Sequence, residues 1–324
     1  MTADCTLTTA CFDLSKYNTG SRSIDDTIRG MLPVLKLPVF MVIYSDKTFM
    51  GLIREIRRTY GLADKTVFNE GSYETLWCAE LTTKVASNRE KYWPSRDART
   101  CSESHLLTCN KFDFVLQTMS QNPFSTSRFG WIDMNLYMGD SRNIKICEDY
   151  SEDVIPALLN NLRDDKFHIQ ILNVADKGLL GDRREFYSKY RYIACGSFFV
   201  CGAETGYKIL TRLKEIVVST TNEGYGHSEE PMYFEILDEF YGDIVRSYGD
   251  YGQILNNFEH PVRNMWYIYY NIIIAYIEFG YHRECIDCCR KMLRSYDEGR
   301  VEMDAILYAK IQAICGISEY NISS

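Results

Sequence analysis

Phe129-Gly130-Trp131-Ile132-Asp133-Met134-Asn135-Leu136 is an apolar run that closes on two polar side chains. A short, continuous apolar stretch of this kind is typical of a strand that is buried on both faces. A helix is expected just before it, over residues 104–121, and this helix stops at Asn122-Pro123-Phe124 because proline cannot continue a helix. The strand therefore delivers Asp133 and Asn135 into the loop that follows it.

Strand and helix signals alternate on both sides of this segment. We expect further strands at residues 5–12, 39–44, 66–68, 144–147, 168–174 and 191–200, and helices at residues 23–31, 49–60, 203–219 and 231–240. Alternation of this kind predicts an α/β fold with a mainly parallel sheet flanked by helices. Ligands of such sheets bind beyond the carboxyl ends of the strands, which places Phe12, Asp13, Ser45 and Asp46 at the expected binding edge.

The chain changes character near its C-terminus. Three helical segments are expected, at residues 262–279, 283–295 and 302–317, and residues 270–293 resemble one tetratricopeptide-type hairpin. A repeat array needs about three such units for stability. We therefore predict a main domain over residues 1–255 and a small all-helical segment over residues 256–324. This segment is interpreted as a cap on the main domain, with partner docking as the alternative.

Composition narrows the class of protein. The 324 residues carry a net charge of −8, which disfavours a nucleic-acid binder. The short basic stretches Arg54–Arg58 and Arg183–Arg191 are interleaved with acids and are interpreted as solvated helix faces. The twelve cysteines are spread along the chain, as in a protein with reduced thiols in a cytosol-like compartment.

No membrane or export signal is apparent at this level. The first residues are polar with no apolar run behind them, and the longest apolar stretch, residues 265–277, is shorter than the about 20 residues that a bilayer span needs. We expect a cytoplasmic protein without a transmembrane segment. The Tyr-, Ile- and Cys-rich composition is compatible with a viral source, and a host cytoplasm or virion would then be its location.

Asp133 and Asn135 together suggest a cation site. Mg²⁺ and Mn²⁺ prefer oxygen ligands, and Mg²⁺ typically takes one or two carboxylates with substrate phosphates as further ligands. Such an ion would act as a Lewis acid on a leaving diphosphate. The alternative is a plain strand-end turn, in which the aspartate bonds nearby backbone.

Three motifs carry a resemblance to a known family. They are Thr8-Thr9-Ala10-Cys11-Phe12-Asp13, then Val42-Ile43-Tyr44-Ser45-Asp46, and chiefly Asn110-Lys111, Asn122-Pro123-Phe124-Ser125-Thr126 and Phe129-Gly130-Trp131-Ile132-Asp133 in this order. Over roughly residues 5–245 the chain resembles the HtrL/YibB family of glycosyltransferase-like proteins of the GT-A fold. The C-terminal helical segment is not covered.

The resemblance implies a nucleotide-sugar donor at the carboxyl edge of the sheet, with a UDP-sugar favoured. It implies that the nucleoside is held by the loop after the first strand and by the second strand end: Thr9, Ala10, Cys11, Phe12, Asp13 and Asp46. Lys111 would reach the diphosphate or sugar, and Asp133 would take the first position of the Asp-x-Asp motif that binds Mn²⁺. Asn135 departs from that motif, because it can ligate only through a neutral carbonyl oxygen. Gly196 and Ser197 would line the acceptor side.

Two adjacent acids, Glu229 and Glu230, follow Gly226-His227-Ser228. This loop resembles the His-Asp-Glu loop of blood-group-type transferases. Glu230, and after it Glu229, is predicted to be catalytic: as a base for the acceptor hydroxyl in an inverting enzyme, or as stabiliser or nucleophile in a retaining one. His227 is a candidate further metal ligand. The alternative is that the two acids merely cap the following helix.

The predicted function is therefore a glycosyltransferase that uses a nucleotide-diphospho-sugar and Mn²⁺ or Mg²⁺. The expected acceptor is a glycan, a protein or a lipid-linked molecule, and a homo-oligomer is left open. The alternative is a non-catalytic protein of the same fold that binds partners through its helical tail.

Overall fold

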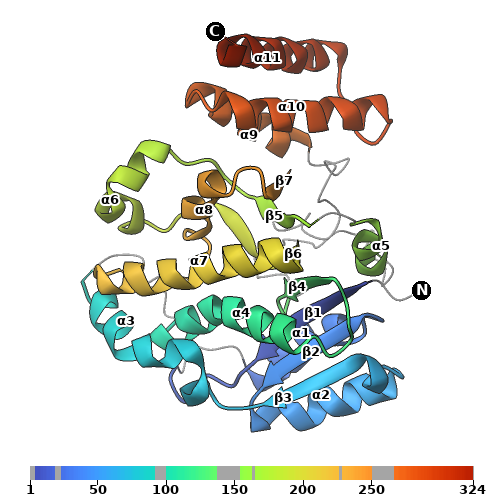
Figure 1. The fold of residues 1–324 in the computed structure, drawn as a ribbon, viewed down its shortest axis with the longest axis vertical. Helices are drawn as coiled ribbons and strands as arrows, with labels where there is room; N and C mark the ends of the chain where they lie inside the picture. Colours follow the sequence, from blue (N-terminus) through green and yellow to red (C-terminus); the bar gives the residue numbers. More distant parts are fainter. Residues whose placement is uncertain are drawn as a thin grey trace.

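A seven-stranded sheet forms the centre of the protein in a computed structural model that describes residues 4–18, 23–91, 100–136, 154–162, 165–225, 228–249 and 266–323 (Figure 1). The strand order is β3-β2-β1-β4-β6-β5-β7. The strands are β1 (Cys5–Cys11), β2 (Phe40–Ser45), β3 (Thr66–Glu70), β4 (Arg128–Ile132), β5 (Phe167–Ile171), β6 (Ala194–Gly202) and β7 (Ile244–Tyr248).

Most neighbouring strands are parallel. The pairs β1–β2, β2–β3, β1–β4 and β5–β7 are parallel, whereas β6 runs antiparallel to both β4 and β5. The carboxyl ends of β1, β2, β3, β4, β5 and β7 therefore meet the beginning of β6 at one edge of the sheet. The predicted mixed, mainly parallel α/β sheet with additional C-terminal helices is confirmed.

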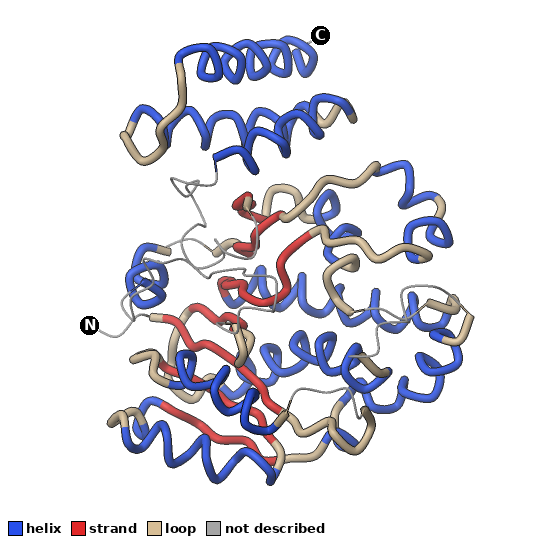
Figure 2. The backbone as a smooth tube through the Cα atoms, turned by 180° about the vertical axis from the view of Figure 1, so that it is seen from behind, coloured by secondary structure: helices blue, strands red, loops and turns tan. Residues whose placement is uncertain are grey.

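Helices cover both faces of this sheet (Figures 1 and 2). The side chains of one face pack with α1, α2 and α5, and those of the other face pack with α4, α7 and α8. The helices are α1 (Ile24–Leu35), α2 (Lys47–Thr59), α3 (Thr82–Arg89), α4 (Ser102–Gln121), α5 (Val154–Asn161), α6 (Arg183–Tyr187), α7 (Ala203–Asn222), α8 (Tyr233–Glu239), α9 (Trp266–Glu278), α10 (His282–Asp297) and α11 (Ala305–Ser323), with short 3₁₀ turns η1 (Ala63–Lys65), η2 (Tyr73–Thr75), η3 (Trp77–Leu81) and η5 (Lys177–Gly181).

The side chains of β1 and β2 alternate between the two faces, as a strand requires. Leu7 and Met41 belong to the core under α1 and α2, while Val42 and Tyr44 belong to the core under α4. Two β1 threonines find hydroxyl partners on this side: the Thr8 hydroxyl donates to Thr118 Oγ1 of α4 at 3.0 Å, and the Thr6 hydroxyl lies 2.7 Å from that of Thr126, in the loop after α4.

The stop after α4 follows from local chemistry. Asn122 closes the helix in the left-handed region at φ 36°, a conformation that asparagine tolerates better than most residues. Its side chain also accepts a hydrogen bond from the Thr126 amide at 3.0 Å and donates to the Thr126 carbonyl at 3.0 Å. This small ring of bonds turns the chain from α4 directly into β4.

One prediction about the basic stretches is wrong. Arg57 of α2 is fully buried, although Arg54–Arg58 was expected to be a solvated face. Its guanidinium donates to the carbonyls of Leu35, Leu37 and Val39 and to the Thr66 hydroxyl, at 2.7 to 3.1 Å. Four hydrogen bonds offset much of the cost of burying this charge, and they join the end of α1 to the start of β2.

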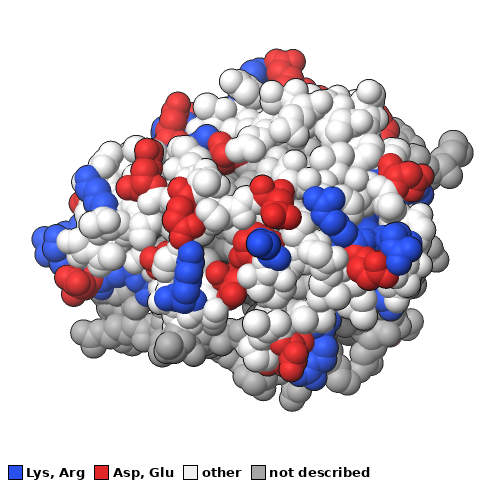
Figure 3. Space-filling model, turned by 90° about the horizontal axis from the view of Figure 1, so that it is seen from below, with Lys and Arg blue, Asp and Glu red and all other residues white. Residues whose placement is uncertain are grey.

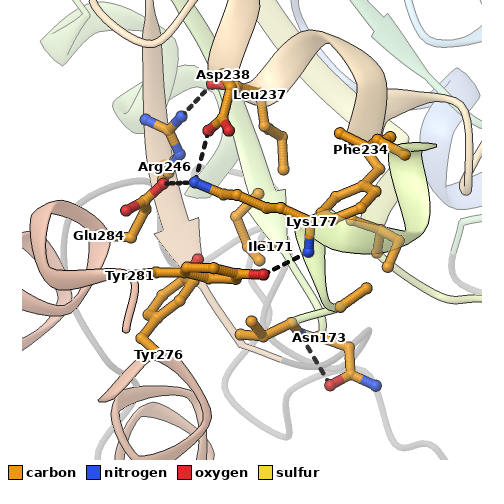
Figure 4. Close-up of a pocket in the computed structure, with 14 residues that line it drawn as sticks. Ile171, Asn173, Lys177, Phe234, Leu237, Asp238, Arg246, Tyr276, Tyr281 and Glu284 are labelled. Atoms are coloured by element: carbon orange, nitrogen blue, oxygen red, sulfur yellow. Dashed lines mark hydrogen bonds and ion pairs between the residues drawn. The ribbon is translucent and has the colours of Figure 1, made fainter. Parts of the chain in front are cut away.

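The sequence did not predict edge strand β7, to which the tail is attached. The Tyr248 hydroxyl at the end of β7 donates to Asp287 of α10 at 2.6 Å. Beside it, the Lys177 ammonium lies 2.8 Å from Asp238 of α8 and 2.6 Å from Glu284 of α10 (Figure 4). The predicted domain boundary at residues 255–256 and the strand signal at residues 144–147 lie outside the described residues.

The surface facing the viewer in Figure 3 carries acidic and basic side chains side by side, without a broad area of one sign on that face. Among the helices of the described ranges, none combines the length and apolar character that crossing a membrane demands.

Candidate functional site

The candidate site lies where the parallel strands end. Asp133 follows β4 directly, and its amide donates to the Ser197 carbonyl of β6 at 2.8 Å. Because β6 runs antiparallel to β4, its first residues extend past the end of β4 and bring Gly196 and Ser197 beside Asp133. The sheet topology thus joins two segments that are more than sixty residues apart in the sequence.

Lys111 is the centre of this site. It projects from the middle of α4 and is 1% exposed. Its ammonium donates to the Gly196 carbonyl at 2.8 Å and to the Glu229 carboxylate, and lies 3.5 Å from Asp133 Oδ1. The same ammonium sits 5.4 Å from the centre of the Trp131 ring, a favourable arrangement of a cation and an aromatic face.

The charge of Lys111 is stabilised by these neighbours. Burial by itself would lower the pKa of Lys111, because it disfavours the charged form, but Asp133 and Glu229 outweigh burial and raise the pKa above its ordinary value. The lysine is therefore an ammonium at all physiological pH values. We find here a permanent cation, held inside the protein by carboxylates from two loops.

Asp133 is held in place but remains open to solvent. Its Oδ1 accepts a hydrogen bond from the Trp131 indole at 2.6 Å, and its side chain is 36% exposed. The Leu136 amide donates to the Asp133 carbonyl at 3.1 Å, so a turn does follow the strand. That turn bond uses the backbone carbonyl of Asp133, whereas its side chain bonds the indole and lies near the ammonium.

Asp133 and Asn135 fit part of a divalent-cation site. The Oδ1 atom of Asn135 is buried and has no hydrogen-bond partner within the described chain. One carboxylate and one free carbonyl oxygen suit an ion that draws its remaining ligands from phosphates and water. No cluster of three or more His, Cys, Asp or Glu side chains suited to a metal occurs in the described ranges, and His227 lies outside them.

Glu229 depends on a glycine in β6. It is 4% exposed, and a Cβ atom added to Gly196 would lie 2.1 Å from its Oε1. The carboxylate therefore occupies the space that any other residue at position 196 would fill, and from there it reaches the Lys111 ammonium. Gly196 thus has two roles: its carbonyl accepts a hydrogen bond from Lys111, and its lack of a side chain leaves room for the Glu229 carboxylate.

Glu230 is bound by a tyrosine that the sequence analysis missed. The Tyr190 hydroxyl donates to Glu230 Oε2 at 2.8 Å and lies 2.7 Å from the Ser228 hydroxyl. Burial, followed by the charge of Glu230, raises the pKa of Tyr190, which keeps the phenol protonated as a donor. Nothing in the sequence indicates this contact, because forty residues separate the partners.

The alternative of helix capping by the two glutamates is not what the structure contains. Helix α8 begins at Tyr233, later than the predicted Pro231, and its N-cap Met232 makes no side-chain capping bond. The side chains of Glu229 and Glu230 instead bond Lys111 and Tyr190.

The predicted nucleoside loop is partly a strand. Thr9, Ala10 and Cys11 belong to β1 and not to a loop, and Thr9 and Cys11 are buried. Burial also raises the pKa of the Cys11 thiol to about 12, so it stays neutral. These two side chains face the core because a strand that is covered on both faces buries its residues on both sides.

Phe12, Asp13 and Asp46 do lie at the edge. The Asp46 carboxylate accepts a bond from the Asp13 amide and, at 3.0 Å, from the Thr48 amide at the start of α2. Phe12 is nearly buried and stacks on Phe114 of α4, with ring centres 6.0 Å apart. Within the described residues, no ion pair joins this group to the Lys111 cluster.

Comparisons with known proteins find similarity at the level of structure and not of sequence. No protein-family model and no curated protein matches the chain. The fold is similar to the crystal structure of mouse xyloside xylosyltransferase 1 in its apo form, with 10% sequence identity, a TM-score of 0.39, and coverage of 74% of this chain and 83% of that one. Membership of the HtrL/YibB family receives no support from these comparisons, so that resemblance rests on the quoted motifs.

Proposed function

We propose that this protein is a glycosyltransferase that takes a sugar from a nucleotide-diphospho-sugar and passes it to an acceptor hydroxyl. The observation that supports this most directly is the buried Lys111 ammonium between Asp133 and Glu229 at the carboxyl edge of the sheet. An anionic diphosphate requires a fixed positive charge, and the edge of such a sheet is where ligands of α/β proteins bind.

Lys111 would act on the leaving group. As the bond between the anomeric carbon and the diphosphate oxygen breaks, negative charge grows on that oxygen. A preorganised ammonium in a site with little water stabilises this charge more strongly than an ammonium in solution. A Mn²⁺ or Mg²⁺ ion held by Asp133 and Asn135 would add Lewis-acid stabilisation of the same diphosphate.

Glu230 would act on the acceptor. In an inverting reaction its carboxylate takes the proton of the attacking hydroxyl while the new bond to the anomeric carbon forms. The Tyr190 hydroxyl donates to one oxygen of this carboxylate at 2.8 Å and holds the carboxylate in position. In a retaining reaction, the alternative that stays open, Glu230 or Glu229 would stabilise the sugar cation or form a covalent intermediate.

A donor panel tests the proposal. The protein is melted with UDP-, GDP-, dTDP- and CMP-sugars, each with Mn²⁺, Mg²⁺ or EDTA, and slow donor hydrolysis is followed in parallel. A ligand at 100 times its dissociation constant should add about 2.7 kcal/mol to the free energy of unfolding. The UDP-sugars are expected to give the largest shift.

Two variants make the panel specific. Asp133→Ala should abolish the donor-dependent shift and the hydrolysis while changing the ligand-free melt little, since this side chain is partly exposed. Asp238→Ala removes a carboxylate that pairs with Lys177 and is the matched control. This control should keep both the donor-dependent shift and the donor hydrolysis. Full donor stabilisation in Asp133→Ala would refute the site, and no shift with any donor would refute the transferase.

The alternative is a non-catalytic protein of this fold that binds a partner through its tail. It is favoured by the outer helix α11, where Ile306, Ile317 and Tyr320 are 71%, 54% and 72% exposed. If this alternative holds, Ile317→Glu should prevent association of the protein with its partner or with a second copy in solution, while Asp133→Ala has no effect on any activity.

A further inference from the structure

An exposed aromatic ring stands next to the proposed acceptor base. Tyr192 is 51% exposed, and its ring centre lies 4.5 Å from that of Tyr190 with the planes tilted by 56°. Most exposed aromatic side chains of a surface need no explanation. Tyr192 differs because the ring that supports it belongs to Tyr190, whose hydroxyl bonds the Glu230 carboxylate.

Tyr192 is also close to the centre of the site along the chain. It precedes Gly196, whose carbonyl accepts from Lys111, by four residues. Four residues of extended chain span at most about 13 Å. Tyr192 therefore lies within about 13 Å of Gly196 along the chain, a distance that one or two linked sugar rings would cover.

The polar groups beside this ring suit a saccharide. A pyranose presents an apolar face of C–H groups and a rim of hydroxyls. An exposed phenol ring offers a flat apolar surface for the C–H face. The Glu230 carboxylate, which the Tyr190 hydroxyl holds and which is 8% exposed, is an acceptor for a hydroxyl of the rim. The raised pKa of Tyr190, caused by burial and then by Glu230, keeps its hydroxyl protonated, and this proton is the one donated to Glu230.

We propose that Tyr192, supported by Tyr190, forms a binding subsite for a pyranose ring of the acceptor. This assignment rests on the proposed transferase function and narrows the acceptor to a saccharide or a glycoconjugate that ends in one. The sugar stacks on Tyr192 and directs a hydroxyl toward Glu230. Tyr192 acts in binding, and the proton transfer stays with Glu230.

Saturation-transfer NMR with simple sugars tests the subsite without turnover. The probes are methyl glycosides of glucose, galactose, xylose and N-acetylglucosamine, each titrated into the full-length protein. We expect signal transfer to the ring C–H protons of at least one glycoside. In Tyr192→Ala its binding should be about tenfold weaker, as the loss of one aromatic contact implies. Tyr192→Trp should retain it.

Tyr207→Ala is the matched control, because Tyr207 of α7 is also an exposed tyrosine, at 62% compared with 51% for Tyr192. Binding that is unchanged in Tyr192→Ala, or that is lost equally in Tyr207→Ala, would overturn the subsite, as would no transfer from any glycoside. The donor panel separates the two proposals: glycoside binding at Tyr192 without any donor shift would retain the saccharide site and refute the transferase.

Discussion

Two lysines of this protein are each held by two carboxylates and an aromatic ring, yet they lie in different settings. Lys111 bonds Glu229, lies near Asp133 and sits against Trp131, and its side chain is 2% exposed. Lys177 bonds Asp238 and Glu284 and lies 4.5 Å from the centre of the Tyr281 ring, and its side chain is 30% exposed (Figure 4).

The surroundings of the two lysines point to different roles. Lys177 joins η5, α8 and α10, so its bonds connect the tail to the main part of the protein. Lys111 joins α4 to two loops at the strand ends, and its acidic neighbours Asp133, Glu229 and Glu230 outnumber it. The Lys177 cluster is therefore structural. The Lys111 cluster instead holds a buried cation beside Asp133, which is open to solvent at the strand ends, as expected of a ligand site.

The largest expected effect comes from removing each ammonium. Lys111→Met should lower the free energy of unfolding by about 3–5 kcal/mol, because it leaves Glu229 as a buried, uncompensated charge. Lys177→Met should cost less, about 1–2 kcal/mol, because Lys177 and Asp238 are partly open to water, which screens them, although Glu284 of the same cluster is buried. Urea unfolding of both variants measures the difference, and equal losses would show that burial does not distinguish the two clusters.

Gly196 tests how closely the Lys111 cluster is packed. Gly196→Ala should cost about 2 kcal/mol, within the usual range for overpacking, because the new Cβ displaces the Glu229 carboxylate from the ammonium. Gly51→Ala in α2 is the matched control: no atom lies within 4 Å of its added Cβ, and alanine favours a helix. We expect that control to unfold at the same temperature or a higher one; a Gly196→Ala melt like that of Gly51→Ala would contradict the packing argument.

Tyr190 tests the positioning of Glu230. Tyr190→Phe should cost about 1.5 kcal/mol, the lower end for a hydrogen bond to a charged group. If Glu230 is the acceptor base, this variant should also lower kcat and leave the KM for the donor nearly unchanged. The reason is that the ring remains in place and only the Glu230 carboxylate loses its hydrogen bond. A change confined to the donor KM would argue against this role.

The smallest effect is a dependence on alkaline pH. The pKa of Tyr190 is raised in the folded protein, so the folded state binds this proton more tightly than the unfolded state does. The resulting stability is complete below the unfolded pKa of about 10 and declines as the pH rises above it. Thermal melts between pH 8 and 11 should therefore decline more steeply for the wild type than for Tyr190→Phe. Parallel curves would contradict the assigned bond.

The local sequence pattern predicted those strands well whose residues are buried on both faces of the sheet. The expected strands at residues 5–12 and 39–44 agree with β1 and β2 to within one residue, because apolar, β-branched runs on both faces leave little choice. Strand β7 was not predicted, since Ile-Val-Arg-Ser-Tyr contains polar residues and becomes a strand only by pairing with β5. The same limit applies to Arg57, whose burial depends on carbonyls that two other segments provide.

By itself, the sequence determined the α/β class, the helical tail and the position of Asp133 at a strand end, because these follow from periodicity and from the residues that stop helices and strands. The tertiary structure alone decided which groups meet. The antiparallel β6 brings Gly196 to Asp133, α4 inserts Lys111 between them, and the loop before α8 adds Glu229 and Glu230. Contacts across forty to more than a hundred residues depend on strand order and direction, which no local pattern encodes.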